Sequence, residues 1–205
     1  MTSETSRTHR RAFMASAAGL GLAALLPAGG FAQQVSVLRP RIEAALNSIR
    51  TQKGRFVQID TASGYGLEGD IYLSRPGRFR FEYDSGDRLL IADGTHVARI
   101  NTRNGNVSRT RLRATPLRII LAETVDLTDG VTITTMEQTP DSLFVTLYEN
   151  GKRDQGLLTV FLDVNSFELR GWKIEENDGN ITTVILQNVE NDVYINPTLY
   201  EIPRN

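Results

Sequence analysis

From residue 55 to residue 190 the sequence alternates apolar and polar residues, and this period of two constrains the fold more than any other feature. The stretch 69–84, GDIYLSRPGRFRFEYD, places Ile71 and Leu73 on one parity and, after a Pro-Gly pair, Phe79, Phe81 and Tyr83 on one parity. Alternation of this kind predicts strands with one buried face. We expect roughly ten such strands, beginning with RFVQID at residue 55 and ending with NITTVILQNV at residue 180.

The expected strands are separated by dipeptides typical of tight turns. These are Asp93-Gly94, Asn104-Gly105, Asn150-Gly151, Asn165-Ser166 and Asp178-Gly179. Strands joined by short turns pair with their sequence neighbours, so the sheet should be antiparallel. Gly171, next to the single tryptophan Trp172, marks an expected bulge.

Two stretches break the strand pattern and predict short helices. In the first, Leu38, Ile42 and Leu46 recur at helical spacing, with Pro40 expected in the first turn and Gly54 expected to stop the helix. The second follows Thr115, which we expect to be an N-cap, and Pro116. Its apolar face is Leu117, Ile120 and Leu121.

A sheet of about ten strands curls, and two short helices cannot cover it as a second sheet would. The predicted fold is therefore mainly β, an incomplete, half-closed antiparallel barrel with a helical lid over its opening. The concave face should be large and apolar.

The N-terminus predicts an exported protein. Arg10-Arg11 precedes an apolar run from residue 14 to residue 26 and then Gly30-Phe31-Ala32. This pattern indicates a twin-arginine signal peptide over residues 1–32, followed by one domain over residues 33–205. The expected location is the periplasm of a Gram-negative bacterium. The chain has no cysteine, which excludes disulfides, thiol catalysis and a lipid on an N-terminal cysteine.

The sequence offers little for catalysis, so we expect no enzyme, no metal and no cofactor. There are two histidines: His9 lies in the predicted signal peptide, and His96 sits beside a predicted hairpin turn. The adjacent Glu175 and Glu176 should point to opposite strand faces. No nucleotide-binding or hydrolase motif stands at a strand-to-helix junction.

Arginines cluster on one predicted strand, where Arg109, Arg111 and Arg113 share a face. A solvated sheet face explains them best, and a docking surface for an acidic partner is the alternative. With a net charge of -1 overall, we expect no nucleic-acid binding.

The predicted concave face holds the candidate binding residues. From the strands these are Ile71, Leu73, Phe79, Phe81, Tyr83 and Leu90, and from the second helix Leu117, Ile120 and Leu121. A plain hydrophobic core is the alternative interpretation of this face.

Arg75 disturbs the simple core interpretation, because it continues the parity of Ile71 and Leu73. A buried arginine is costly unless its five donors find acceptors. The unpaired carbonyls at the end of a covering helix or loop would supply them. We therefore predict that Arg75 is a latch that holds a lid over the sheet.

The chain resembles the outer-membrane lipoprotein carrier protein family, LolA. The resemblance rests on Gly69-Asp70, Arg75-Pro76, Phe79 and the aromatic residue at 81, then Ala92-Asp93-Gly94 and Thr115-Pro116-Leu117. Arg118 stands where the family more usually has an apolar residue. The resemblance implies that Arg75 closes the empty cavity and that Phe79 lies at the cavity mouth.

The resemblance also implies the function and the partners. A LolA-like protein carries acylated lipoproteins through the periplasm as a monomer. It receives them from an inner-membrane lipoprotein-releasing ABC transporter and delivers them to an outer-membrane receptor or to the outer membrane itself. Two alternatives on the same scaffold stay open: a periplasmic lipid-binding sensor and a carrier of free lipids.

Overall fold

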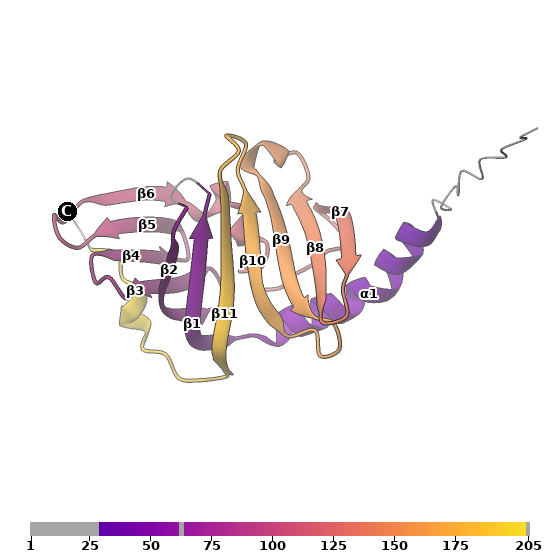
Figure 1. Cartoon of the computed structure of the whole chain (residues 1–205), viewed down its shortest axis with the longest axis horizontal. Coiled ribbons are helices and arrows are strands. Elements are labelled where there is room, and N and C mark those ends of the chain that lie inside the picture. The colour runs from indigo at the N-terminus through magenta and orange to yellow at the C-terminus, as the bar shows by residue number, and fades with distance from the viewer. Residues whose placement is uncertain (1–28, 62–63, 204–205) are drawn as a thin grey trace, which may run out of the picture.

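The computed structural model describes residues 29–61 and 64–203, and eleven of its segments form one antiparallel sheet (Figure 1). The strands are β1 (Thr51–Asp60), β2 (Gly66–Ser74), β3 (Arg78–Tyr83), β4 (Arg88–Asp93), β5 (His96–Asn101), β6 (Val107–Arg111), β7 (Val131–Gln138), β8 (Ser142–Glu149), β9 (Leu157–Asp163), β10 (Leu169–Glu175) and β11 (Ile181–Asn191). The predicted mainly β, antiparallel fold is confirmed, with eleven strands where we expected roughly ten.

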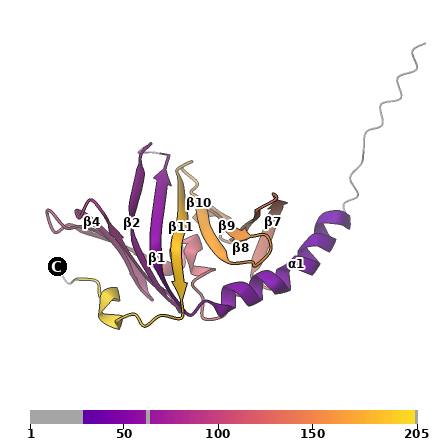
Figure 2. The same ribbon diagram turned by 60° about the horizontal axis from the view of Figure 1, so that its bottom comes forward.

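The strand order is β6-β5-β4-β3-β2-β1-β11-β10-β9-β8-β7. Consecutive strands pair with each other except β6 and β7, and the pair of β1 with β11 joins the two halves of the sheet. The sheet curves strongly, as Figure 2 shows, yet β6 and β7 remain its two outer edges. The barrel is therefore open, as predicted.

The turns lie where the local signals predicted them. Gly94, Gly105, Gly151 and Gly179 all have positive φ angles and lie in the connections between consecutive strands. Gly171 sits at a register shift between β10 and β9, and a Cβ atom on it would lie 2.2 Å from the carbonyl oxygen of Val184. The predicted bulge is confirmed, and only glycine fits there.

The first helix is longer than predicted. Helix α1 (Gly29–Ser48) contains Pro40 in its interior rather than in its first turn. It ends at Ser48, well before Gly54, which lies within β1. Our boundaries were wrong because the helix begins at Gly29, well before Leu38, and because the chain enters β1 at Thr51. The predicted signal peptide lies almost entirely outside the described residues, and that prediction stays a prediction.

The second predicted helix is not an α-helix. Residues 112–130, which we call the connecting segment, hold only two 3₁₀ turns, Leu112–Ala114 and Pro116–Arg118. Thr115 caps neither turn with its side chain, because its hydroxyl donates to the Leu112 carbonyl instead. A helix this short gains few hydrogen bonds against its nucleation cost, so tertiary contacts decide its form.

The concave face of the sheet carries the core. Residues from α1, from the inner strand faces and from the connecting segment form one buried cluster, in which Ile42, Phe56 and Leu121 are nearly inaccessible. The C-terminal tail lies elsewhere: its 3₁₀ turn Pro197–Tyr200 contacts β3 and β4, and Ile202 packs on a smaller cluster around Ile91 and Ile100. Among the described residues, α1 and the connecting segment are thus the elements that cover the concave core.

Candidate functional site

A cavity of about 690 Å³ opens on the concave face, and its floor is apolar. This volume lies within the range of roughly 300–1,000 Å³ that is usual for ligand pockets. Its apolar lining is Phe79, Phe81, Tyr83, Leu90, Val97, Ile100, Pro116, Leu117, Trp172, Ile174 and Val184. Both halves of the sheet and the connecting segment therefore contribute to one cavity.

Aromatic rings form one wall of this cavity, and Phe56 packs behind them. The ring centroid of Phe81 lies 4.5 Å from that of Phe56, 5.5 Å from that of Phe79 and 6.2 Å from that of Trp172. Such spacings are those of favourable aromatic pairs. The cluster is a rigid wall against which an apolar ligand can pack.

Tyr83 supplies a polar atom within this wall. Its hydroxyl donates a 2.8 Å hydrogen bond to Gln58 Oε1. Burial raises the pKa of Tyr83 to about 12, although the nearby charges of Arg88 and Arg99 act in the opposite direction. The phenol is therefore neutral at physiological pH, which suits an apolar ligand.

The rim of the cavity is polar and carries both signs of charge. Arg88 stands over the Tyr83 ring, with its guanidinium carbon 5.4 Å from the ring centroid. Arg99, Asp87 and Glu176 also line the rim. An apolar cavity with a mixed, solvated rim can take up an apolar chain while the rest of the ligand stays in water.

The structure divides the predicted binding residues into two groups. Those that line the cavity are Phe79, Phe81, Tyr83, Leu90 and Leu117. Those that lie in the core cluster without lining it are Ile71, Leu73, Ile120 and Leu121. Their role in lipid binding stays a prediction in both groups.

Phe79 does not occupy an exposed mouth. It is only 3% exposed and lies against Phe81. Phe79 lines the cavity together with Leu117 of the connecting segment, and its place at the cavity mouth stays a prediction.

Sequence reasoning missed the second half of the cavity. Trp172 and Val184 pair with each other across β10 and β11, and β11 lies next to β1. The β1–β11 pairing is non-local, so no local pattern indicated that these residues would face Phe81. The one available signal was that Trp172 is the only tryptophan in the chain.

The guanidinium of Arg75 lies between α1 and the connecting segment, and the side chain is 7% exposed. Its Nε and Nη2 atoms donate to the Ala122 carbonyl at 2.8 and 2.6 Å. Its Nη1 atom donates to the carbonyls of Leu46 and Ile49 at the end of α1. One side chain thus joins the strand, the end of the helix and the connecting segment.

Burial lowers the pKa of Arg75, and the nearby charge of Arg50 acts in the same direction. An arginine still stays protonated, because its ordinary pKa is far above neutral. Carbonyl oxygens at a helix C-terminus carry partial negative charge and suit a cation. Carbonyls, rather than a carboxylate, are the acceptors described for Arg75.

Asn47 completes the contact and was not singled out from the sequence. Its Oδ1 atom accepts from the Val125 amide at 2.8 Å and from Arg75 Nη2 at 3.1 Å. Its Nδ2 atom donates to the Val125 carbonyl at 2.9 Å. Glu43, one turn earlier on α1, accepts from the Leu127 amide at 2.7 Å. Helix α1 therefore holds the connecting segment through polar bonds to its backbone.

Arg118 provides a further tie to the sheet. Its guanidinium pairs with the carboxylate of Glu149 at the end of β8, which also pairs with Lys152 at 2.8 Å. Both side chains are partly exposed, so the pair is a weak link in solution. This explains why a charged residue is accommodated at 118.

Residues 29–61 and 64–203 contain neither a cluster of metal ligands nor a membrane-spanning helix. No group of three or more His, Asp or Glu side chains in these ranges is placed to hold a metal ion. No helix among the same residues is long and apolar enough to cross a membrane.

The comparisons with known proteins agree with this architecture. Residues 47–203 match the family model described as outer membrane lipoprotein carrier protein LolA. A protein of Methylococcus capsulatus named outer-membrane lipoprotein carrier protein is 25% identical over 182 residues, which is 84% of this chain and 86% of that protein. One of the same name from Chromohalobacter salexigens is 27% identical over 80% of this chain and 82% of its own length.

Among solved structures, a DUF1329 family protein from Desulfovibrio piger superposes with a TM-score of 0.51 at 10% identity. The match covers 82% of this chain and 96% of that chain. At this identity the likeness shows the fold alone.

Proposed function

Because the chain belongs to the LolA family of outer membrane lipoprotein carrier proteins, we propose that it carries acylated lipoproteins from the inner to the outer membrane. The acyl chains occupy the cavity on the concave face, and the protein part of the cargo stays outside. The site of action is the periplasm. The protein acts as a monomeric carrier and not as an enzyme.

The observation that carries this proposal is a cavity with an apolar wall whose cover, the connecting segment, is held by polar bonds in which the buried Arg75 takes part. Leu117 of the connecting segment lines the cavity, while Arg75 binds the same segment at Ala122. The cover is tied by hydrogen bonds to backbone carbonyls, which water can replace when the segment moves. A core meant only for stability has no need of such a removable tie.

The free energy of acyl-chain burial favours a connecting segment that closes over the cavity again after the cargo has left. Each buried methylene contributes about 0.8 kcal/mol, so a long acyl chain gains on the order of 10 kcal/mol by leaving water. That gain prevents escape into water, but it also opposes delivery. When Leu117 and its neighbours fill the cavity again and Arg75 regains its carbonyls, part of this gain is returned, and release to a membrane acceptor becomes favourable.

The same arrangement defines the partners. A donor must extract the acyl chains from the inner membrane, and a lipoprotein-releasing ABC transporter does such work. An acceptor with a better apolar site, either an outer-membrane receptor or the outer membrane itself, must take them up. A carrier of free lipids and a lipid-binding sensor differ from this proposal in the cargo found on the protein.

A cross-link across the connecting segment tests the proposal. The chain has no cysteine, so Arg118→Cys with Glu149→Cys gives a unique pair at the partly exposed Arg118–Glu149 ion pair. A short bifunctional thiol reagent then fixes the segment to β8. We expect that the cross-linked protein no longer releases lipoprotein from spheroplasts into the soluble fraction. The double variant without the reagent should still release it.

Release that is unaffected by the cross-link would contradict the movable cover. Mass spectrometry of the protein isolated from its own periplasm identifies the cargo. Co-purified acylated lipoprotein supports the carrier, whereas lipid without protein would indicate one of the two alternatives.

A further inference from the structure

Strand β6 is an open edge of the sheet (Figure 1). Its pairing with β5 is regular from residue 107 to residue 111, and no other described strand pairs with it. The opposite edge, β7, is protected, because a register shift between Ile133 and Thr135 makes it irregular and α1 contacts it. Strand β6 therefore offers unpaired backbone groups to a partner strand.

The hydrogen-bond register shows which backbone groups of β6 face outward. The Leu112 amide donates to the Thr95 carbonyl at 2.8 Å, so these two residues form a hydrogen-bonded pair of the ladder. Bonded and non-bonded pairs alternate in an antiparallel ladder, so the next pair, Arg111 with His96, is non-bonded, and so is the pair that contains Arg109. The backbone N–H groups of Arg109 and Arg111 therefore point away from β5.

The two faces of β6 differ in chemistry. Ser108 and Thr110 line the cavity of about 690 Å³ that we propose for the acyl chains. Arg109 and Arg111 alternate with them and lie on the convex side, where Arg109 donates to the Pro203 carbonyl of the tail. A strand added to β6 would place one set of side chains beside the acyl chains and the other set beside the arginines.

A hollow of about 570 Å³ lies at the end of β6, and its charged lining is cationic. It is lined by Arg111 and His96, by Arg113 from the following 3₁₀ turn, and by Arg118. Arg118 is already paired with Glu149, whereas Arg111 and Arg113 are exposed and their guanidinium groups have no partner among the described residues. No Asp or Glu of the described residues lines this hollow.

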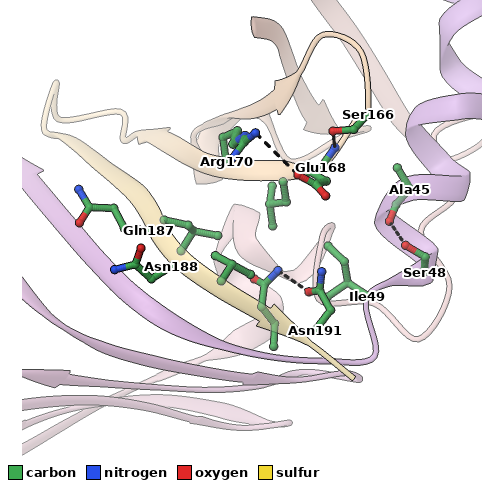
Figure 3. Close-up of a pocket in the computed structure, with 13 residues that line it drawn as sticks. Ala45, Ser48, Ile49, Ser166, Glu168, Arg170, Gln187, Asn188 and Asn191 are labelled. Carbon is green, nitrogen blue, oxygen red and sulfur yellow. Dashed lines mark hydrogen bonds and ion pairs between the residues drawn. The ribbon is translucent and has the colours of Figure 1, made fainter. Parts of the chain in front are cut away.

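The cavity at the end of α1, of about 370 Å³, shows the contrast (Figure 3). Its one arginine, Arg170, lies 3.7 Å from Glu168, as the dashed line in Figure 3 marks, and pairs with Asp163 at 3.0 Å. Unpaired arginines on an edge strand have a different effect. They oppose pairing with a second copy of this chain, which would set arginine against arginine, and they favour a strand that carries carboxylates.

We propose that β6 binds an extended, acidic segment of the cargo polypeptide as an additional strand. Carboxylates at alternate positions of this segment pair with Arg109 and Arg111, and a further carboxylate enters the hollow beside Arg113. The proposal rests on the proposed carrier function, because the segment follows the acylated residue. Since Ser108 and Thr110 line the acyl-chain cavity and belong to the edge strand, a polypeptide that emerges past them lies directly at the unpaired N–H groups.

The test uses the chain without its predicted signal peptide, residues 33–205, and three probes below their critical micelle concentrations. Trp172, the only tryptophan, lines the acyl-chain cavity and reports binding by fluorescence. The acidic probe is an Nα-palmitoyl-Ser-Glu-Thr-Glu-Thr-Glu amide, the neutral probe has glutamine in place of each glutamate, and palmitamide lacks the peptide. Two cross-strand ion pairs, each contributing about threefold, predict that the acidic probe binds about tenfold more tightly than the neutral one.

Two variants separate backbone pairing from charge. Arg111→Pro removes an outward N–H group, and proline fits because residue 111 has a φ angle of -69°. It should reduce binding of both peptide probes nearly to that of palmitamide. Arg111→Gln keeps the N–H group and should lower only the preference for the acidic probe, by about threefold.

Two controls accompany these variants. Arg170→Gln removes an exposed arginine far from β6 along the strand order and should keep the preference for the acidic probe. Unchanged affinity for palmitamide in each variant shows that the acyl-chain cavity is intact.

The outcomes separate this site from the carrier proposal. If none of the three probes binds, the carrier proposal fails and the strand site fails with it. If palmitamide binds but the acidic and neutral probes bind equally, or if Arg111→Pro leaves both peptide probes unaffected, the strand site is refuted while the carrier proposal stands. If calorimetry shows that the acidic peptide with an acetyl group in place of palmitoyl binds as tightly as the acidic probe, the occupant is a separate acidic protein, which also overturns the proposal.

Discussion

Replacement of Arg75 by leucine should loosen the connecting segment without unfolding the sheet. Four backbone carbonyls accept from Arg75: Leu46, Ile49, Ala122 and Glu123. Leu46 and Glu123 each have a second described donor, the Ile49 amide and Arg50. Ile49 at 3.3 Å and Ala122 at 2.6 and 2.8 Å are the two for which Arg75 is the described donor. In the closed arrangement the variant leaves both without that donor. If the connecting segment moves away, water reaches them.

The expected loss of stability of the closed arrangement follows from these two carbonyls and from the leucine that replaces Arg75. Two buried carbonyls without partners cost roughly 2–6 kcal/mol together. A buried leucine on the same apolar strand face returns about 1.5–3 kcal/mol. The closed arrangement should therefore lose about 2 kcal/mol, which corresponds to a shift of about 30-fold toward the open one.

Hydrogen–deuterium exchange read by mass spectrometry measures this shift. Peptides from residues 112–130 should exchange about 30-fold faster, and so should Gly77, whose amide donates to the Leu121 carbonyl at 2.8 Å. Peptides from β9 and β10 should be unchanged. Arg75→Lys, which keeps the charge but loses the fork of donors, should be intermediate.

Arg50→Leu is the control for loss of a positive charge nearby, because Arg50 makes a single 3.4 Å bond to the Glu123 carbonyl. It should leave the exchange of residues 112–130 nearly unchanged. Faster exchange in every strand of Arg75→Leu would show instead that Arg75 supports the whole core. No change anywhere would show that its hydrogen bonds do not hold the segment.

Three further predictions test neighbouring features. Asn47→Ala should speed exchange of the Val125 amide by about tenfold, since two hydrogen bonds to that residue are lost, with unfolding in urea as the check that the core persists. In the folded protein the pKa of Tyr83 is about 12, whereas in the unfolded chain a tyrosine has a pKa of about 10. From Tyr83 alone, the free energy of unfolding should therefore fall by roughly 2 kcal/mol between those pH values. Burial also raises the pKa of Tyr200 to about 12, so the fall in Tyr83→Phe should be smaller by roughly 2 kcal/mol rather than absent. Gly69→Ala should lower the melting temperature sharply, because its Cβ atom would lie 2.0 Å from a carbonyl oxygen of β3. Gly66→Ala, with open space around it, should change the melting temperature little.

The strands and their turns could be predicted from the sequence because both signals are local. A residue and its second neighbour share a strand face whatever the strand packs against. Glycine at a positive φ angle likewise needs only its own backbone. These rules placed Phe79, Phe81 and Tyr83 on one buried face, and they placed Arg75 at its end.

The helices were predicted less well, because their ends depend on contacts with distant parts of the chain. Helix α1 ends where the chain enters β1, and Gly54, which we took for a stop signal, instead permits the close approach of β11. The segment after Thr115 has helical spacing but too few residues to form a helix of its own. Its form is set by α1, through Asn47 and Glu43, and by Arg75.

The apolar, alternating character of the concave face and the position of a buried cation on it are properties of the sequence alone. The cavity itself is a tertiary property, because the β1–β11 pair joins residues more than a hundred positions apart and brings Trp172 to Phe81. The bulge between β1 and β11 is tertiary as well, since it forms where Gly54 approaches the backbone of Gln187 and Asn188. Sequence periodicity reports which face of a strand is buried, whereas the partner across that face is chosen by packing of the whole chain.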